Sequence, residues 1–183
     1  SELERVEEEI KRLIDESERI NRKVVKEIED TIRTSEEINR EAHRRNRELI
    51  KRVEDVVRTK GGEDEEVVRI VRKVLEEVKK SNTDVKRVTK TVHDDNRRLL
   101  EEVKRVSEEV LKTIKRLVED LRRKGVDEKE LRRVEEEVRK VVRDSERHLD
   151  EVYKRSKEAV DRSKKHLDKD VEEIDRVVKE IER

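Results

Sequence analysis

Residues 89–96, which read Thr-Lys-Thr-Val-His-Asp-Asp-Asn, place hydrogen-bonding side chains in the middle of a long helical pattern of Val, Ile and Leu. In an antiparallel helical hairpin, residues that face each other have a constant index sum. That sum is 124 for four pairs of polar residues: Thr31 with His93, Ser35 with Thr89, His43 with Ser81, and Ser17 with Ser107. The stretch therefore predicts polar layers that meet on neighbouring helices and decide how these helices pair.

The composition limits the class of protein. The 183 residues include no Pro, Cys, Met, Trp or Phe, and 56% of them are charged. Basic and acidic residues number 51 each, so there is no net charge to attract nucleic acid or an anionic membrane. The lack of cysteine excludes disulfides and thiolate chemistry, and no apolar run reaches the roughly 18 residues of a membrane span. We expect a soluble protein without a targeting signal, suited to recombinant cytoplasmic expression.

Three segments carry apolar residues at steps of three and four, which predicts amphipathic helices at about 2–59, 65–123 and 128–182. Apolar alternation with a period of two is absent, so a sheet is not expected. Because the two connections are short, the chain must run up, down and up. The sequence predicts an all-α, antiparallel up-down-up three-helix bundle, coiled-coil-like with long helices, as a single domain over residues 1–183.

Local signals mark the predicted helix ends. Each helix follows a residue whose side-chain oxygen can accept a hydrogen bond from the first turn, and Ser1 and Asp127 each have a Glu three residues later, as in a capping box. The first two helices run into glycines, which supply the left-handed conformation that closes a helix. The residues concerned are Ser1, Asp64 and Asp127 at the start, and Gly61, Gly62 and Gly125 at the end.

Eighteen polar residues interrupt the apolar seams. If the loops are pivots, facing residues have index sums of about 123 and about 250 in the two antiparallel pairs of helices, and a difference of about 126 in the parallel pair. The first cluster is then Ser17, Asn21, Ser107, Ser145 and His148. The second is Thr31, Ser35, Thr89, His93, Asn96 and Ser156, with Tyr153 as a further candidate. The third is Asn39, His43, Asn46, Ser81, Asn82, Ser163 and His166.

These clusters predict buried hydrogen-bond networks. A buried polar group without a partner costs about 1 to 3 kcal/mol, so the members must satisfy one another, and a slipped register would leave several of them unpaired. The alternative is that individual Ser and Thr side chains are exposed or bonded to their own helix. The grouping of residues from all three helices favours the networks.

Other chemistry has little support in the sequence. His43 and His166 could share a metal, but no carboxylate lies among the seam positions beside them, and we predict neither a metal nor another cofactor. Asp144, Ser145 and His148 include the residue types of a catalytic triad, but no segment could form an oxyanion hole, so we predict that the protein is not an enzyme. The charge runs are interpreted as solvated faces, and no interleaved aromatics indicate nucleic-acid binding.

Capped helices of equal length, short Gly-containing loops, a Lys/Arg/Glu/Asp surface, a Val/Ile/Leu core and separate Ser/Thr/Asn/His layers together resemble computationally designed helical bundles with buried hydrogen-bond networks. The resemblance covers the whole chain and is one of pattern. It implies a structural scaffold without natural biochemical activity, whose folding specificity is set by those networks, and which requires no partner as a monomer.

The alternative function is a protein-interaction module: a homo-oligomer, one half of a helix-accepting heterodimer, or a cage-type switch. Such a module would leave part of the apolar stripe open for a helical partner or a second copy. A pH-responsive version is part of this alternative, because four buried neutral histidines would resist protonation, and the folded state would lose stability as the pH falls.

Overall fold

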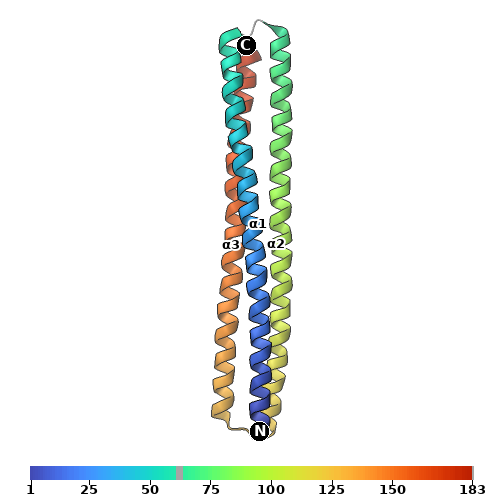
Figure 1. The fold of residues 1–183 in the computed structure, drawn as a ribbon, viewed down its shortest axis with the longest axis vertical. Coiled ribbons are helices and arrows are strands. Elements are labelled where there is room, and N and C mark those ends of the chain that lie inside the picture. Colours follow the sequence, from blue (N-terminus) through green and yellow to red (C-terminus); the bar gives the residue numbers. More distant parts are fainter. Residues whose placement is uncertain (61–63, 183) are drawn as a thin grey trace. The chain divides into compact units, whose positions relative to one another are not determined.

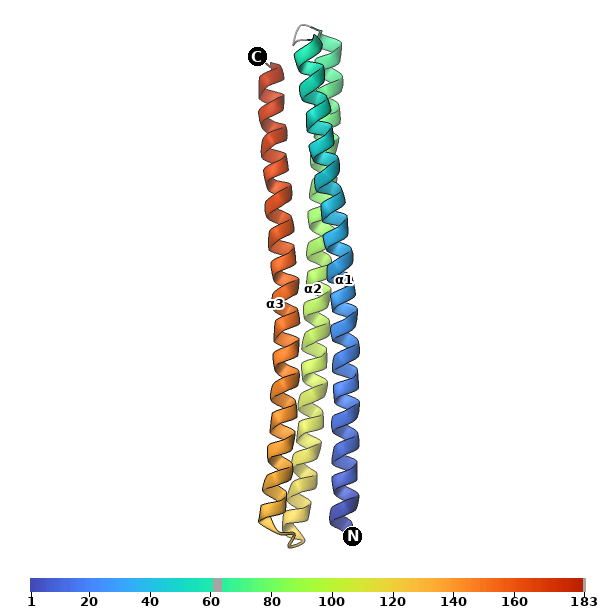
Figure 2. The same cartoon turned by 60° about the vertical axis from the view of Figure 1, so that its left-hand side comes forward.

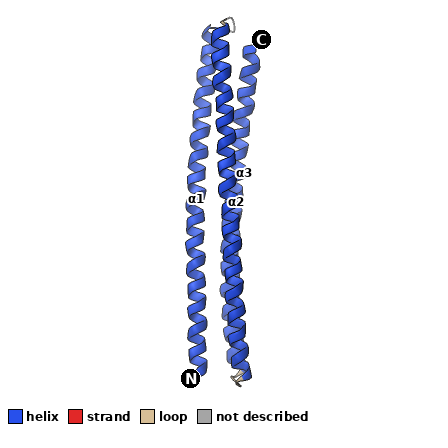
Figure 3. Ribbon diagram, turned by 90° about the vertical axis from the view of Figure 1, so that its right-hand side faces the viewer, coloured by secondary structure: helices blue, strands red, loops and turns tan. Residues whose placement is uncertain are grey.

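The computed structural model describes residues 1–60 and 64–182. They form three helices, α1 (Glu2–Lys60), α2 (Glu65–Arg123) and α3 (Glu128–Glu182), whose bounds lie within one residue of those predicted. Figure 3 shows the helices and the loop between α2 and α3, and the described residues contain no strand. The all-α, three-helix fold class is therefore confirmed. The predicted closure of the first helix by Gly61 and Gly62 lies outside the described residues.

The chain divides into two compact units. Unit 1 comprises Ser1–Asp30 and Asp95–Ser156, and unit 2 comprises Thr31–Asp94 and Lys157–Arg183. Each helix contributes one segment to each unit, and within either unit the three segments lie side by side, with α2 running opposite to α1 and α3 (Figures 1 and 2). Each unit is thus an up-down-up three-helix bundle. That the whole chain behaves as a single domain stays a prediction.

The helix N-termini are capped by the side chains that the sequence singles out. Ser1 Oγ accepts a hydrogen bond from the backbone N–H of Glu4 at 3.3 Å. Asp64 Oδ1 accepts one from the N–H of Glu66 at 3.1 Å. Asp127 Oδ1 accepts one from the N–H of Lys129. Each cap satisfies one of the N–H groups that have no partner within the helix.

Gly125 ends α2 and turns the chain toward α3. Its φ angle is +83°, in the left-handed region that favours glycine. Its N–H donates to the carbonyl of Arg122, and the N–H of Val126 donates to the carbonyl of Leu121, both at 3.2 Å. This pair of bonds is a Schellman motif, and Val126 packs against the same apolar cluster as Leu121. One glycine therefore fixes the turn between the two helices in unit 1.

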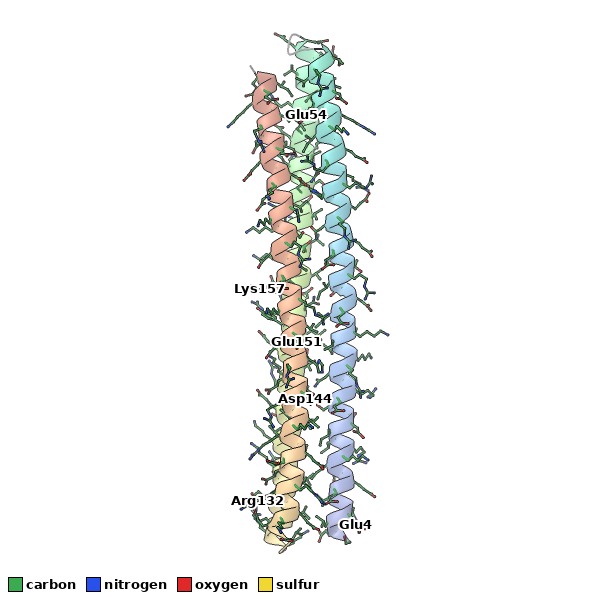
Figure 4. The ribbon with its side chains drawn as sticks, turned by 90° about the vertical axis from the view of Figure 1, so that its left-hand side faces the viewer. Glu4, Glu54, Arg132, Asp144, Glu151 and Lys157 are labelled. Atoms are coloured by element: carbon green, nitrogen blue, oxygen red, sulfur yellow. The ribbon has the colours of Figure 1, made fainter. Side chains whose placement is uncertain are left out.

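Each unit has an apolar core with contributions from all three helices. In unit 1 the buried residues are Ile10, Ile114, Val118, Leu121, Leu131 and Val138. In unit 2 they are Ile50, Val53, Val71, Leu75, Ile174, Val177 and Ile181. Full burial of such a side chain stabilises a fold by roughly 1.5 to 3 kcal/mol. The charged residues labelled in Figure 4, such as Arg132 and Lys157, lie on the outside and are exposed.

Ion pairs between helices measure the register. Between the parallel helices α1 and α3, Arg47 with Glu173 and Glu29 with Arg155 both differ by the expected 126 residues. Between the antiparallel helices α2 and α3, the pairs have index sums four above the expected value of about 250. These pairs are Arg72 with Glu182, Lys79 with Asp175, Lys86 with Asp168, and, in unit 1, Lys104 with Asp150.

The higher index sum of facing residues in the antiparallel helices has a simple geometric cause. Side chains on an α-helix lean toward the N-terminus of their own helix. In a parallel pair both side chains lean the same way, so the register read from backbone heights holds. In an antiparallel pair they lean in opposite directions, and each residue meets a partner further along the chain than the backbone alone predicts. The α1–α2 pairs predicted from an index sum of 124 are therefore about one turn away from the observed contacts, Asn39 with Thr89 and Asn46 with Asn82, whose index sum is 128.

The inward face also differs in places from the predicted seam. On α2 the buried positions 75, 82, 89, 96 and 103 repeat at every seventh residue, a spacing that keeps one face of a slightly supercoiled helix toward its neighbours. Four apolar residues expected in the seams are exposed instead: Ile38 and Val56 on α1, and Val88 and Val106 on α2.

Candidate functional site

Buried polar side chains in unit 2 connect all three helices, and we call these four residues the Asn46 network: His43, Asn46, Asn82 and Asp170. Asn46 Nδ2 of α1 donates to Asn82 Oδ1 of α2 at 2.8 Å and to Asp170 Oδ2 of α3 at 3.0 Å. Asn46, Asn82 and Asp170 are only 4%, 1% and 1% exposed. Because each helix supplies a member, a shift of any helix would break at least one bond.

Asp170 is the acceptor at the centre of this network. His43 Nδ1 lies 2.7 Å from Asp170 Oδ2, and because an ionised carboxylate only accepts, the imidazole is the donor. His43 is partly buried, and its ring centroid lies 5.5 Å from that of His166. Hydrogen bonds to a charged group are stronger than neutral ones, which offsets part of the cost of burying the carboxylate.

Asp170 is a residue that the sequence analysis missed. The expectation that no carboxylate lies beside His43 is wrong. A signal was present, because Leu167, Asp170 and Ile174 follow the three-and-four spacing of a seam and all three are buried. The separation of 127 residues between His43 and Asp170 also matches the register of the parallel helices. Asp170 was not recognised as a seam residue because all charged residues were assigned to the surface.

A second polar contact in unit 2 joins α1 and α2. Asn39 Nδ2 donates to Thr89 Oγ1 at 3.0 Å and to the carbonyl of Ser35 at 2.7 Å. Thr89 Oγ1 in turn donates to the carbonyl of Val85 at 2.9 Å. Asn39 thus pairs with a member of the predicted second cluster, although it was assigned to the third, as the shifted antiparallel register requires.

The first predicted cluster is arranged differently. In unit 1, Ser17, Asn21, Ser107 and Ser145 line a cavity of about 270 Å³ together with apolar residues of all three helices. Asn21 Nδ2 and Ser107 Oγ are buried without a hydrogen-bond partner among the described residues. These four residues therefore converge without forming a network.

The structure places the other predicted site residues as follows. Nine are buried: Asn21, Ser35, Asn39, Asn46, Asn82, Thr89, Asn96, Ser156 and Ser163. Partly buried are Ser17, Thr31, His43, His93, Ser107 and Ser145, together with the further candidate Tyr153. Whether all of them act together to set folding specificity stays a prediction.

Three residues predicted to be buried are exposed, and for these the prediction is wrong. They are Ser81, His148 and His166. In each case the next residue along the chain, namely Asn82, Leu149 or Leu167, is buried instead. One residue is a rotation of about 100° around the helix, so only one of two adjacent residues can point inward. For the two histidines the neighbour is a leucine, whose burial removes more apolar surface from water.

The hypothesis of a pH response required four buried histidines. His148 and His166 are exposed, and His43 and His93 are only partly buried. The premise of four buried histidines is therefore wrong, because two of them are in contact with water and neither of the other two is fully buried.

Among residues 1–60 and 64–182, no three His, Asp or Glu side chains form a group that could hold a metal. Asp144 and His148 are exposed, and no hydrogen bond in this part of the chain joins either of them to Ser145. None of the described helices has a stretch with the length and hydropathy that crossing a membrane requires.

The charge cluster with the clearest electrostatic effect lies at the turn between α2 and α3. The Arg122 guanidinium donates to Glu128 at 3.0 and 3.1 Å and to Glu135 at 3.1 Å. The hydrogen bond from Arg122 holds the pKa of Glu128 below its ordinary value of 4.5, and the same contact raises the pKa of Arg122. This exposed cluster joins the two helices of unit 1 at the surface.

Comparisons with known proteins give a structural match but no family. No protein-family model matches the chain, and no curated protein matches it. Among solved structures, the chain is similar to a protein described as "Computationally designed three helix bundle", with 15% sequence identity and a TM-score of 0.43 over 97% of this chain and 85% of that one.

Proposed function

We propose that the protein is a designed structural scaffold without natural biochemical activity, whose folding specificity is set by buried polar contacts. The observation that carries this proposal is the Asn46 network, in which one amide bridges α2 and α3 from α1. An apolar core tolerates sliding by a heptad or a change in the number of helices, whereas a network of this kind leaves polar groups unpaired in any alternative packing.

The proposal is tested by making the network apolar. In a triple variant with Asn46→Leu, Asn82→Leu and Asp170→Leu, we expect helical content to be kept, because buried polar groups that are all replaced by apolar ones need cost no stability. We expect the specificity to be lost, with several oligomers in light scattering and broadened amide signals in NMR spectra. The parent chain should give one species of 22.1 kDa.

A matched control uses unit 1, where the polar residues form no such network. The triple variant with Asn21→Leu, Ser107→Val and Ser145→Val should keep a single mass and sharp spectra. If the unit 2 variant is equally uniform, the Asn46 network does not set specificity, and the proposal fails.

The second candidate function is self-association, and it is favoured by an open groove in unit 2 between α1 and α2. Ile38, Ala42 and Leu49 line it from α1, and Val78 and Val85 line it from α2, around a volume of about 610 Å³. Ile38 is 43% exposed. The other four apolar residues are partly buried. Apolar residues that line an open groove are typical of sites that accept a helix.

Charges on the rim of this groove favour a second copy as its occupant. Glu37 and Arg45 both line the groove, on either side of Glu41. An antiparallel copy of α1 centred near Glu41 would set Glu37 of each chain against Arg45 of the other. Light scattering separates the two candidates: a mass of 22.1 kDa at all concentrations supports the scaffold, whereas twice that mass, lost on Ile38→Glu, supports self-association.

A further inference from the structure

The cavity of unit 1 combines an apolar wall with polar side chains from all three helices. Its volume of about 270 Å³ is larger than the roughly 150 Å³ of an apolar cavity that holds benzene. One wall is apolar and includes Ile14, Leu111, Ile114 and Val138, while Ser17, Asn21, Ser107 and Ser145 contribute polar groups. A single substituted ring would fit this space.

Two polar groups in the wall are available to a ligand. Asn21 is 7% exposed, and its Nδ2 donates to no other described residue. Ser107 Oγ on α2 is likewise buried and without a partner. Buried polar groups in folded proteins nearly always form hydrogen bonds, and leaving one unpaired is costly. A molecule that accepts from the Asn21 amide and exchanges a hydrogen bond with the Ser107 hydroxyl would satisfy both.

The charges around the cavity restrict the class of ligand further. Lys104 and Asp150, which are 2.9 Å apart, line it together with Glu108 and Glu146. Three carboxylates against one ammonium group give a negative surrounding, which disfavours anions.

We propose that this cavity is a binding site for small neutral aromatic molecules that carry one hydroxyl group, with phenol as the simplest member. The ring packs against the apolar wall of Leu111, Ile114 and Val138. The hydroxyl oxygen accepts a hydrogen bond from Asn21 Nδ2, and its proton is donated to Ser107 Oγ. The site belongs to unit 1 alone and is independent of the Asn46 network in unit 2.

The proposal is tested by titrating the whole chain, labelled with ¹⁵N, with phenol, toluene and benzoate in parallel. We expect phenol to shift the amide signals around the cavity in unit 1 with a saturable Kd of about 1 mM, a value within the range for a ligand of this size. Toluene should bind about fivefold more weakly, because it forms no hydrogen bond, and benzoate should not bind.

Two variants assign the hydrogen bond and the location. Asn21→Leu should weaken phenol binding about fivefold without weakening toluene binding, and Asn21→Ala should likewise remove the preference for phenol if the leucine is not tolerated. Ser107→Leu should fill the cavity and abolish both. Asn39→Leu replaces a buried asparagine of unit 2 and should leave phenol binding unchanged.

Several results would overturn the proposal. Phenol shifts that do not saturate, or that spread equally over both units, would show that there is no site. Equal binding of phenol and toluene, or unchanged phenol binding in both Asn21 variants, would show that the polar groups do not recognise a ligand. Ordered water in the cavity that phenol does not displace would assign the polar groups to hydration only.

Discussion

The polar residues of unit 1 and unit 2 were predicted from the same pattern, yet they form different arrangements. In unit 2 the Asn46 amide reaches both Asn82 and Asp170, and the contacts close across three helices. In unit 1 three of the four convergent residues are serines, whose side chains are too short to span the space between helices, and a cavity remains. The length of the side chain, and not only its polarity, decides whether a polar layer becomes a network.

The difference between the two units is tested most directly by replacing the corresponding asparagine in each of them. Asn46→Leu should lower the free energy of unfolding by about 3 kcal/mol, because it leaves the buried Asp170 carboxylate and Asn82 without their shared donor. Asn21→Leu should change it by about 1 kcal/mol or less, because Asn21 Nδ2 has no partner to lose in the described part of the chain. Urea unfolding followed by circular dichroism measures both.

Hydrogen exchange provides the control for that experiment. Loss of amide protection in Asn46→Leu should be greatest in unit 2. Similar destabilisation by the two substitutions would mean that the contacts around Asn46 contribute no more than burial of the asparagine itself.

A smaller effect is expected from filling the cavity. Ser107→Val replaces an unpaired buried hydroxyl by apolar volume, and should raise the free energy of unfolding by about 1 kcal/mol. Ser81→Val, which adds the same atoms at an exposed position of α2, should have almost no effect. Thermal unfolding of the two variants is sufficient for the comparison, and a Ser107→Val protein that melts lower than the parent would contradict the cavity in unit 1.

The smallest expected effect is on the stability of the folded chain at low pH. Because the pKa of Glu128 is lowered in the folded chain, its contribution to stability is complete above the unfolded value of 4.5 and is lost as the pH falls through the folded value. Arg122→Gln removes the main cause of the lowered pKa. We expect its melting temperature to lie about 1 to 2 °C below that of the parent at pH 6, and the difference to vanish near pH 2.

The control for the acid experiment is Arg123→Gln. Among the residues that the structure describes, Arg123 pairs only with Asp120 of its own helix, at 3.9 Å. Its substitution should not change the pH dependence, and an equal change in both variants would assign the effect to total charge.

The sequence was sufficient to predict the helices and the parallel register, because these depend on periodicity, capping residues and backbone rise. It was less informative about which of two adjacent residues points inward. A pattern with steps of both three and four does not decide between two adjacent residues. Ser81, His148 and His166 were therefore predicted to be buried, although the next residue along the chain is the buried one. The role of Asp170 depends on its contacts with His43 and Asn46 on another helix, which composition alone does not reveal.

Because side chains lean toward the N-terminus of their own helix, the residues that face each other follow one rule in the parallel pair of helices and another in the antiparallel pairs. A cysteine cross-link between α2 and α3 chosen from Cα heights would bring together thiols that point away from each other, while the same procedure would succeed between α1 and α3. Anyone who moves these helices into another assembly must therefore offset the facing residues by about a turn for each antiparallel pair, and by nothing for the parallel one.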